Sequence, residues 1–174
     1  MKMRILPLAF SLLLMTVGLS FAGNKMLSRP WRPYLLERDS YSTTVTHLPA
    51  PRHDSRISPK MVLASKIAEQ RAVSHPSLLC WRYVKKALLE AHAVEAYPAT
   101  VNARQAGGEL VSRYGFVKLP IGNPNLAPVG SVLVYAGHGP GHVELRTENG
   151  FVSDFRSTRA CPWQLLGVYA KLSS

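Results

Sequence analysis

Residues 137–146 read GHGPGHVELR, and residues 147–155 continue as TENGFVSDF. A glycine-rich bend leads His142 onto an alternating segment that predicts a strand, and a second alternating segment from Phe151 returns with Asp154. A histidine and a carboxylate on neighbouring strands can serve as a general base and the group that orients it. The best candidate in the chain for the nucleophile that such a pair would activate is Cys80.

The length of the loop between these two strands decides which side chains share a face. A two-residue turn at Asn149-Gly150 would set polar residues of one strand beside apolar residues of the other. A three-residue loop, residues 148–150 with Gly150 left-handed, pairs Thr147 with Phe151, and we expect this register. It gathers one apolar face from Val143, Leu145, Phe151 and Phe155, and one polar face from His142, Glu144, Arg146, Asp154 and Arg156.

In this register Glu144 lies directly across from Asp154, so both carboxylates are candidates for orienting His142. We expect Asp154 to take that role and keep Glu144 as the alternative. A loop of two residues would remove the case for Asp154.

Helices are predicted before the strands. Ser58-Pro59 is typical of a helix start, and Ser77 predicts the cap of a second helix that carries Cys80 in its first turn. One apolar stripe of this second helix is predicted to consist of Cys80, Val84, Ala87, Leu88 and Ala91. Gly115 would end a third helix. The predicted helices span residues 58–73, 78–93 and 102–114, and the predicted strands span residues 131–136, 142–147, 151–157 and 165–171. Helices followed by antiparallel strands indicate an α+β domain.

The N-terminal third divides into two segments. Residues 1–22 resemble a secretory signal, because Lys2 and Arg4 precede an apolar run and Ser20 and Ala22 suit a cleavage site. Residues 23–57 are rich in proline and basic side chains and predict a linker or tail. The domain itself is expected at residues 58–174, and a retained membrane anchor is the alternative reading of the first segment.

The charge of the chain favours an anionic partner. Losing Lys2 and Arg4 with the signal reduces the formal net charge from +11 to +9. Such an excess attracts polyanions in general, and an export signal makes nucleic acid the poorest choice and a cell-surface polymer the best. We therefore expect a monomer, periplasmic or secreted, that binds such a polymer and does not insert stably into the membrane. A solvated basic face without a specific partner is the alternative.

The two cysteines, Cys80 and Cys161, permit opposite interpretations. Disulfides persist in an exported protein, so the pair could form a bridge, and Cys80 would then be no nucleophile. As a free residue in the first turn of a helix, Cys80 would have its thiolate favoured by the helix and by an adjacent imidazole. A zinc site from His138, His142, Asp154 and Cys161 lacks paired-ligand spacing, and we expect no metal or cofactor.

Three motifs resemble a known group of enzymes. They are CWRYV at residues 80–84 on a helix start, PVGSVLV at residues 128–134 entering a strand, and GHV at residues 141–143 on the next strand. They resemble the CHAP amidase/peptidases and their NlpC-type relatives, which are papain-like cell-wall hydrolases. The resemblance covers residues 77–171, and it departs from the family pattern at Ser131, where many relatives carry Asp, and in the additional Cys161.

The resemblance implies a papain-like fold with N-terminal helices packed on a small antiparallel sheet. It also implies cleavage of an amide or peptide bond in peptidoglycan through a thioester, with Cys80 as nucleophile, His142 as base and Asp154 as orienter. The backbone N–H of Cys80 would hold the oxyanion. Two alternatives remain: a non-catalytic domain of the same fold with a Cys80–Cys161 bridge that binds an anionic surface, and a secreted effector hydrolase with a protein substrate.

Overall fold

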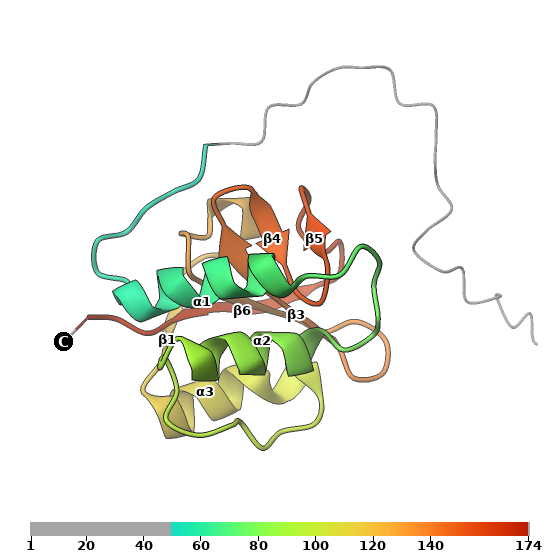
Figure 1. Cartoon of the computed structure of the whole chain (residues 1–174), viewed down its shortest axis with the longest axis horizontal. Helices are drawn as coiled ribbons and strands as arrows, with labels where there is room; N and C mark the ends of the chain where they lie inside the picture. Colours follow the sequence, from blue (N-terminus) through green and yellow to red (C-terminus); the bar gives the residue numbers. More distant parts are fainter. Residues whose placement is uncertain (1–49, 174) are drawn as a thin grey trace, which may run out of the picture. The chain divides into compact units, whose positions relative to one another are not determined.

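The computed structural model describes residues 50–173 (Figure 1). The predicted signal peptide and residues 23–49 of the predicted tail lie outside the described residues. The helices are α1 (Pro59–Arg71), α2 (Cys80–Glu90), η1 (Ala103–Gln105), α3 (Ala106–Tyr114) and η2 (Pro124–Leu126), and the strands are β1 (Val117–Leu119), β2 (Val132–Tyr135), β3 (His142–Thr147), β4 (Gly150–Val152), β5 (Arg156–Ser157) and β6 (Leu165–Ala170). Within residues 50–173, no helix has the length and apolar character needed to cross a bilayer.

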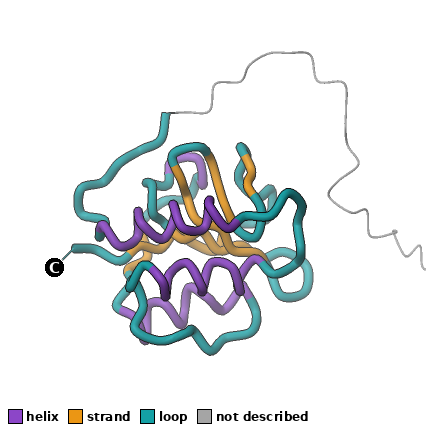
Figure 2. The backbone as a smooth tube through the Cα atoms, in the orientation of Figure 1, coloured by secondary structure: helices purple, strands orange, loops and turns teal. Residues whose placement is uncertain are grey.

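The strands form one antiparallel sheet in the order β1-β6-β2-β3-β4-β5. Helices α1 and α2 lie side by side along this sheet, and both pack against β3. Figure 2 shows these helices in purple and the strands in orange. Strand β1 was not predicted, because three residues with two exposed side chains carry almost no periodic signal. The element order is that of the predicted α+β domain.

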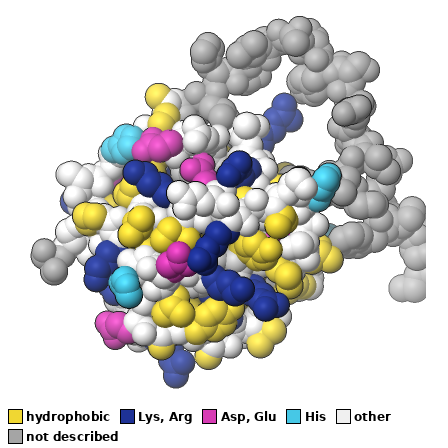
Figure 3. All heavy atoms as spheres, in the orientation of Figure 1, with side chains coloured by type: hydrophobic (Ala, Val, Ile, Leu, Met, Phe, Trp, Pro, Cys, Tyr) yellow, Lys and Arg dark blue, Asp and Glu magenta, His cyan; other side chains and the backbone are white. Residues whose placement is uncertain are grey.

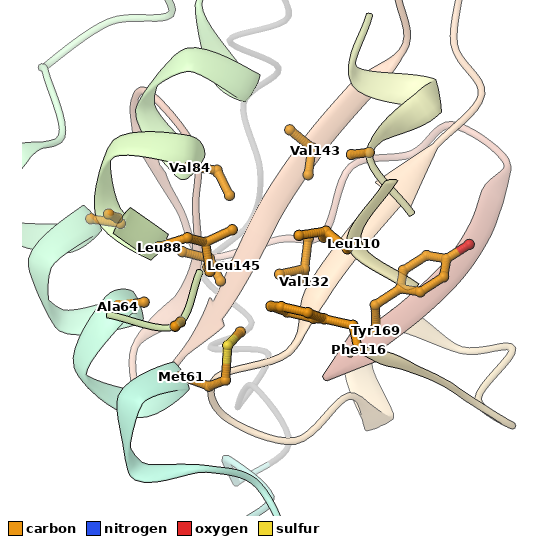
Figure 4. Close-up of a cluster of buried hydrophobic side chains, with 14 of the residues drawn as sticks. Met61, Ala64, Val84, Leu88, Leu110, Phe116, Val132, Val143, Leu145 and Tyr169 are labelled. Atoms are coloured by element: carbon orange, nitrogen blue, oxygen red, sulfur yellow. The ribbon is translucent and has the colours of Figure 1, made fainter. Parts of the chain in front are cut away.

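The main core lies between the helices and the sheet. Side chains from α1, α2 and α3 meet those of β2, β3 and β6, and Figure 4 shows Leu88 of α2 close to Leu145 of β3. The stripe predicted on the second helix is confirmed, since Val84, Ala87 and Leu88 are fully buried. A smaller apolar cluster holds Ala127, Leu133, Tyr135, Phe151 and Val168, with Cys161 packed against it. Leu133 and Tyr135 alternate along β2 with Val132 and Val134 of the main core, so the second cluster belongs to the other face of the sheet.

The predicted register between β3 and β4 is wrong. Thr147 pairs with Gly150, and Arg146 pairs with Phe151, so the loop has two residues, Glu148 and Asn149. The expectation failed because it required one face to be solvated and polar. Both faces of the sheet are covered, and Phe151 instead lies in the second cluster, where the guanidinium carbon of Arg146 is 4.7 Å from its ring centroid.

The strand predicted at residues 151–157 is not continuous. It ends at Val152, bends through residues 153–155 and resumes as β5, whose Arg156 pairs back with Val152. Asp154 therefore lies in a tight hairpin loop rather than on a strand. This bend removes it from the position opposite Glu144 that the predicted register required.

Packing on the domain begins before the predicted boundary at residue 58. Ile57 is 5% exposed and bridges to Leu172, and Arg52 bridges to Pro128. Ser58 occupies the N-cap position of α1 and Pro59 its first turn, as predicted, although the serine side chain makes no capping hydrogen bond. The last residues of the predicted tail are thus part of the folded unit.

Candidate active site

Cys80 is the first residue of α2. It is partly exposed, and its side chain packs at the edge of the main core, as the apolar stripe predicted. The first N–H groups of a helix lack acceptors within the helix, so this terminus favours negative charge. Leu78, two residues before Cys80, has a positive φ of 61°, which is unfavourable for a leucine. Its side chain is 78% exposed.

His142 is the first residue of β3, at the end of the glycine-rich bend. Its side chain is 15% exposed and interacts electrostatically with the Cys80 side chain. The Nε2 atom lies 3.5 Å from Oε2 of Glu144. Burial lowers the pKa of His142, but the hydrogen bonds and charges of Cys80 and Glu144 outweigh it and raise that pKa to about 9.

Glu144 is the carboxylate that meets the imidazole. It is 3% exposed, and its other oxygen, Oε1, accepts hydrogen bonds from Tyr135 Oη at 2.6 Å and from the backbone N of Cys161 at 3.3 Å. His142 and Glu144 are two residues apart on β3 and so share one side of the strand. The structure therefore brings together Cys80, His142 and the alternative orienter.

Asp154 lies at the start of α2 instead. Its Oδ2 accepts hydrogen bonds from Ser77 N at 2.6 Å, Ser77 Oγ at 2.8 Å and Leu79 N at 3.3 Å, while Ser153 Oγ lies 3.0 Å from Oδ1. Burial raises the pKa of Asp154, but these hydrogen bonds outweigh it and hold the pKa below its ordinary value. Since the β3–β4 loop has two residues, the expectation that Asp154 orients His142 loses its basis, and Glu144 is the carboxylate that lies beside the imidazole.

Cys80 and Cys161 are both free thiols. The structure therefore contains no disulfide between Cys80 and Cys161, contrary to the alternative interpretation of the sequence. Burial and the nearby Glu144 and Cys80 raise the pKa of Cys161 to about 11, against the hydrogen bond from the Trp163 backbone, so its thiol stays protonated at neutral pH. Cys80 is thus the cysteine that can act as a nucleophile.

The glycine-rich bend accommodates large side chains beside His142. A Cβ on Gly137 would lie 2.1 Å from the Trp163 ring, and Gly137 has a positive φ of 51°. Trp163 is 38% exposed and meets the His142 ring edge-on, with 6.2 Å between centroids. His138 is exposed, as expected of a loop residue. No group of three or more His, Cys, Asp or Glu side chains among residues 50–173 is arranged to hold a metal ion.

Sequence reasoning missed two residues of this site, Tyr135 and Trp163. Tyr135 lies near the end of an apolar run, and its hydroxyl was the one signal in that run of a polar contact on the buried strand. Trp163 follows Cys161-Pro162 in a segment without periodicity, where nothing pointed to His142. Both are found only when the strands are paired.

Comparison with known proteins bears on the fold. No family model matches the chain, and no curated protein matches it. One chain of the type VI native effector–immunity complex Tae3–Tai3 from Ralstonia pickettii is similar in structure, with a TM-score of 0.53 and 23% sequence identity over 64% of this chain and 98% of that chain. The predicted papain-like α+β fold, with helices packed on an antiparallel sheet, is confirmed.

Proposed function

We propose that this protein is an exported cysteine amidase or peptidase that cleaves an amide bond in peptidoglycan. The observation that carries the proposal is the chain of contacts from Cys80 through His142 to Glu144 at the start of α2. A thiol, an imidazole and a carboxylate in this order are the parts of a nucleophile, its base and the orienter of that base.

The chemistry would proceed in two steps. The Cys80 thiolate attacks the carbonyl carbon, and the resulting oxyanion is held by N–H groups at the start of α2, that of Cys80 among them. The C–N bond breaks as His142 gives its proton to the departing amine, which leaves a thioester on Cys80. Water then loses a proton to His142 as it attacks the thioester, and the acid departs with the thiolate restored.

Four features support peptidoglycan as the substrate. The fold is shared with a chain of an effector–immunity complex. The motifs around Cys80, Gly130 and His142 resemble those of CHAP and NlpC-type cell-wall enzymes, and an N-terminal signal would take the protein out of the cytoplasm. The positive net charge suits an anionic wall.

The test is turnover of purified peptidoglycan by Cys80→Ala and Cys80→Ser. Each should lose activity by about 1,000-fold or more, since the thiolate is gone and a serine hydroxyl is a much weaker nucleophile. Thermal unfolding should remain close to that of the parent, because Cys80 is partly exposed and lies at the edge of the main core. Undiminished release of wall fragments by a folded Cys80→Ala protein would refute the proposal.

A second candidate is a secreted effector that uses the same site on a protein substrate. Two features favour it: the structural similarity to a chain of an effector–immunity complex, and the exposed apolar side chains of Leu78 and Leu79 directly before the nucleophile, which suit a protein partner. Cys80-dependent cleavage in a mixture of cell proteins, together with intact peptidoglycan, would favour this candidate over the first.

A further inference from the structure

Tyr135 touches the proposed base. It is the last residue of β2 and pairs directly with His142 across the strands. Its ring is fully buried and lies 6.1 Å from the imidazole, centroid to centroid, at a tilt of 39°. Together with the Trp163 ring, it restricts the space in which the imidazole can rotate.

Tyr135 also holds the proposed orienter. Its hydroxyl donates to Oε1 of Glu144 at 2.6 Å, the shorter of the two hydrogen bonds that this oxygen accepts. A carboxylate that is 3% exposed requires such donors, because burial without them disfavours its charge. With Oε1 held, the other oxygen faces Nε2 of His142.

The backbone is irregular where Tyr135 lies. Along β2, Val134 pairs with Gly167 of β6, but Tyr135 pairs with Leu165, so β6 carries an additional residue at this point. A bulge of this kind redirects neighbouring side chains and is frequent beside active sites. Tyr135 therefore contacts both the His142 ring and the Glu144 carboxylate, and it lies where the pairing of β2 with β6 shifts register.

We propose that Tyr135 is a positioning residue, which fixes the Glu144 carboxylate by one oxygen so that the other orients His142. This rests on the proposed cysteine hydrolase function. The titratable and charged groups around that carboxylate are His142 and Arg146 on β3, Cys80 on α2 and Cys161 before β6. Tyr135 would act on the reaction only through Glu144 and His142.

The test combines Tyr135→Phe, which keeps the ring, with Glu144→Gln and the double variant. The readout is the rate at which iodoacetamide alkylates Cys80 between about pH 5 and 9, where the Cys161 thiol stays protonated. Tyr135→Phe should slow alkylation at pH 7 about 5-fold and shift the profile to higher pH, because a less well oriented imidazolium supports the thiolate less. Glu144→Gln should have the larger effect.

The double variant decides between positioning and a separate contribution. If Tyr135 acts through Glu144, the double variant should alkylate at the rate of Glu144→Gln alone. Tyr169→Phe is the matched control, a buried tyrosine on the neighbouring strand β6, and should leave the profile unchanged. The proposal is overturned if the fold-losses in alkylation rate of the two single variants multiply in the double variant. An unchanged alkylation profile for Tyr135→Phe would also overturn it.

Iodoacetamide needs no substrate site, so the result does not depend on peptidoglycan being the substrate. If peptidoglycan is not cleaved but the alkylation profiles behave as expected, the proposed function fails and the role of Tyr135 stands. With an active enzyme, Tyr135→Phe should lower kcat about 5-fold and leave KM nearly unchanged. A rise in KM alone would place Tyr135 in substrate binding and contradict the proposal.

Discussion

At the scale of single residues, His142 is held in a state that suits an ion pair with a thiolate. Burial alone would keep the imidazole neutral, whereas the contacts with Cys80 and Glu144 favour the protonated form and raise the pKa to about 9. At neutral pH the imidazolium can therefore accompany a thiolate and later give its proton to a leaving amine. The carboxylate of Asp154, the orienter expected from the sequence, instead accepts hydrogen bonds from Ser77, Ser153 and Leu79.

This state of His142 predicts the alkaline side of the activity profile. The raised pKa means that the imidazolium form persists up to about pH 9 and is lost as the pH rises through that value. Activity of the parent should therefore fall on the alkaline side with a midpoint near 9, measured as kcat/KM against pH. Replacing Glu144 with Gln removes a hydrogen bond and a charge that raise this pKa, so the midpoint should move to lower pH and kcat/KM should fall roughly 10- to 100-fold.

The matched control for Glu144→Gln is Glu148→Gln. Glu148 lies in the β3–β4 loop, and its side chain is exposed. Its Oε2 lies 3.3 Å from Nε2 of His53, and it has no part in the proposed chemistry. This variant should keep the parent profile. A Glu144→Gln protein with an alkaline midpoint still near 9 would show that another group orients His142.

At the scale of elements, the β4–β5 hairpin fastens the connection that leads into α2. The backbone N of Val73 donates to the Asp154 carbonyl at 2.8 Å, and Nε of Arg156 donates to the carbonyl of Glu69 at 2.9 Å. The Asp154 carboxylate accepts hydrogen bonds from the backbone N of Ser77 and of Leu79. The hairpin thereby fixes the unfavourable turn at Leu78 that sets Cys80 at the helix start.

Asp154→Asn should accordingly weaken the fold. Loss of the charge on the acceptor of these hydrogen bonds should lower the free energy of unfolding at pH 7 by about 2 kcal/mol, measured by urea denaturation. Because the pKa of Asp154 is held below its ordinary value, its stabilising effect is present above the unfolded pKa and is lost as the pH falls through the folded one. The difference between parent and variant should therefore shrink as the pH falls below the ordinary Asp pKa of about 4.

The partly exposed Asp54, which pairs with the exposed Arg56, provides the control. Asp54→Asn should change stability little, since an exposed ion pair contributes little. A difference between parent and Asp154→Asn that persisted undiminished at low pH would mean that the carboxylate charge is not what stabilises the connection.

The sequence was sufficient for elements with strong periodicity and insufficient for pairings. Strand β3 was predicted with its observed bounds, Gly115 ends α3 in the left-handed conformation, and Cys80 lies in the first turn of α2. The register failed because alternation alone cannot distinguish a solvated face from one covered by a second apolar cluster. The choice between Asp154 and Glu144 depended on that register, so the sequence indicated that Cys80 and His142 belong to one site but not which carboxylate lies beside His142.

At the scale of the whole molecule, positive charge and an apolar edge could both attract a wall polymer. Lys and Arg side chains lie at several separate places on the face that Figure 3 shows, with hydrophobic side chains between them. Leu78, Leu79 and Trp163 are exposed near the proposed site. Charge acts over a distance that salt shortens, whereas apolar contact does not weaken with moderate salt, and this difference separates the two contributions.

Binding of Cys80→Ala protein to purified peptidoglycan, measured by co-sedimentation, should therefore depend on salt. With a formal net charge of +11 for the whole chain, or +9 without the predicted signal, we expect affinity to fall about 10-fold between roughly 0.05 M and 0.5 M NaCl, because the Debye length shortens over that range. Peptidoglycan stripped of its anionic polymers should bind more weakly at low salt and show a smaller dependence. Alkylation of Cys80 by neutral iodoacetamide in the parent protein should hardly change, which would exclude an effect of salt on the site itself. Affinity that stayed constant across this range would contradict recognition by charge and leave the apolar edge beside Cys80 as the surface that holds the substrate.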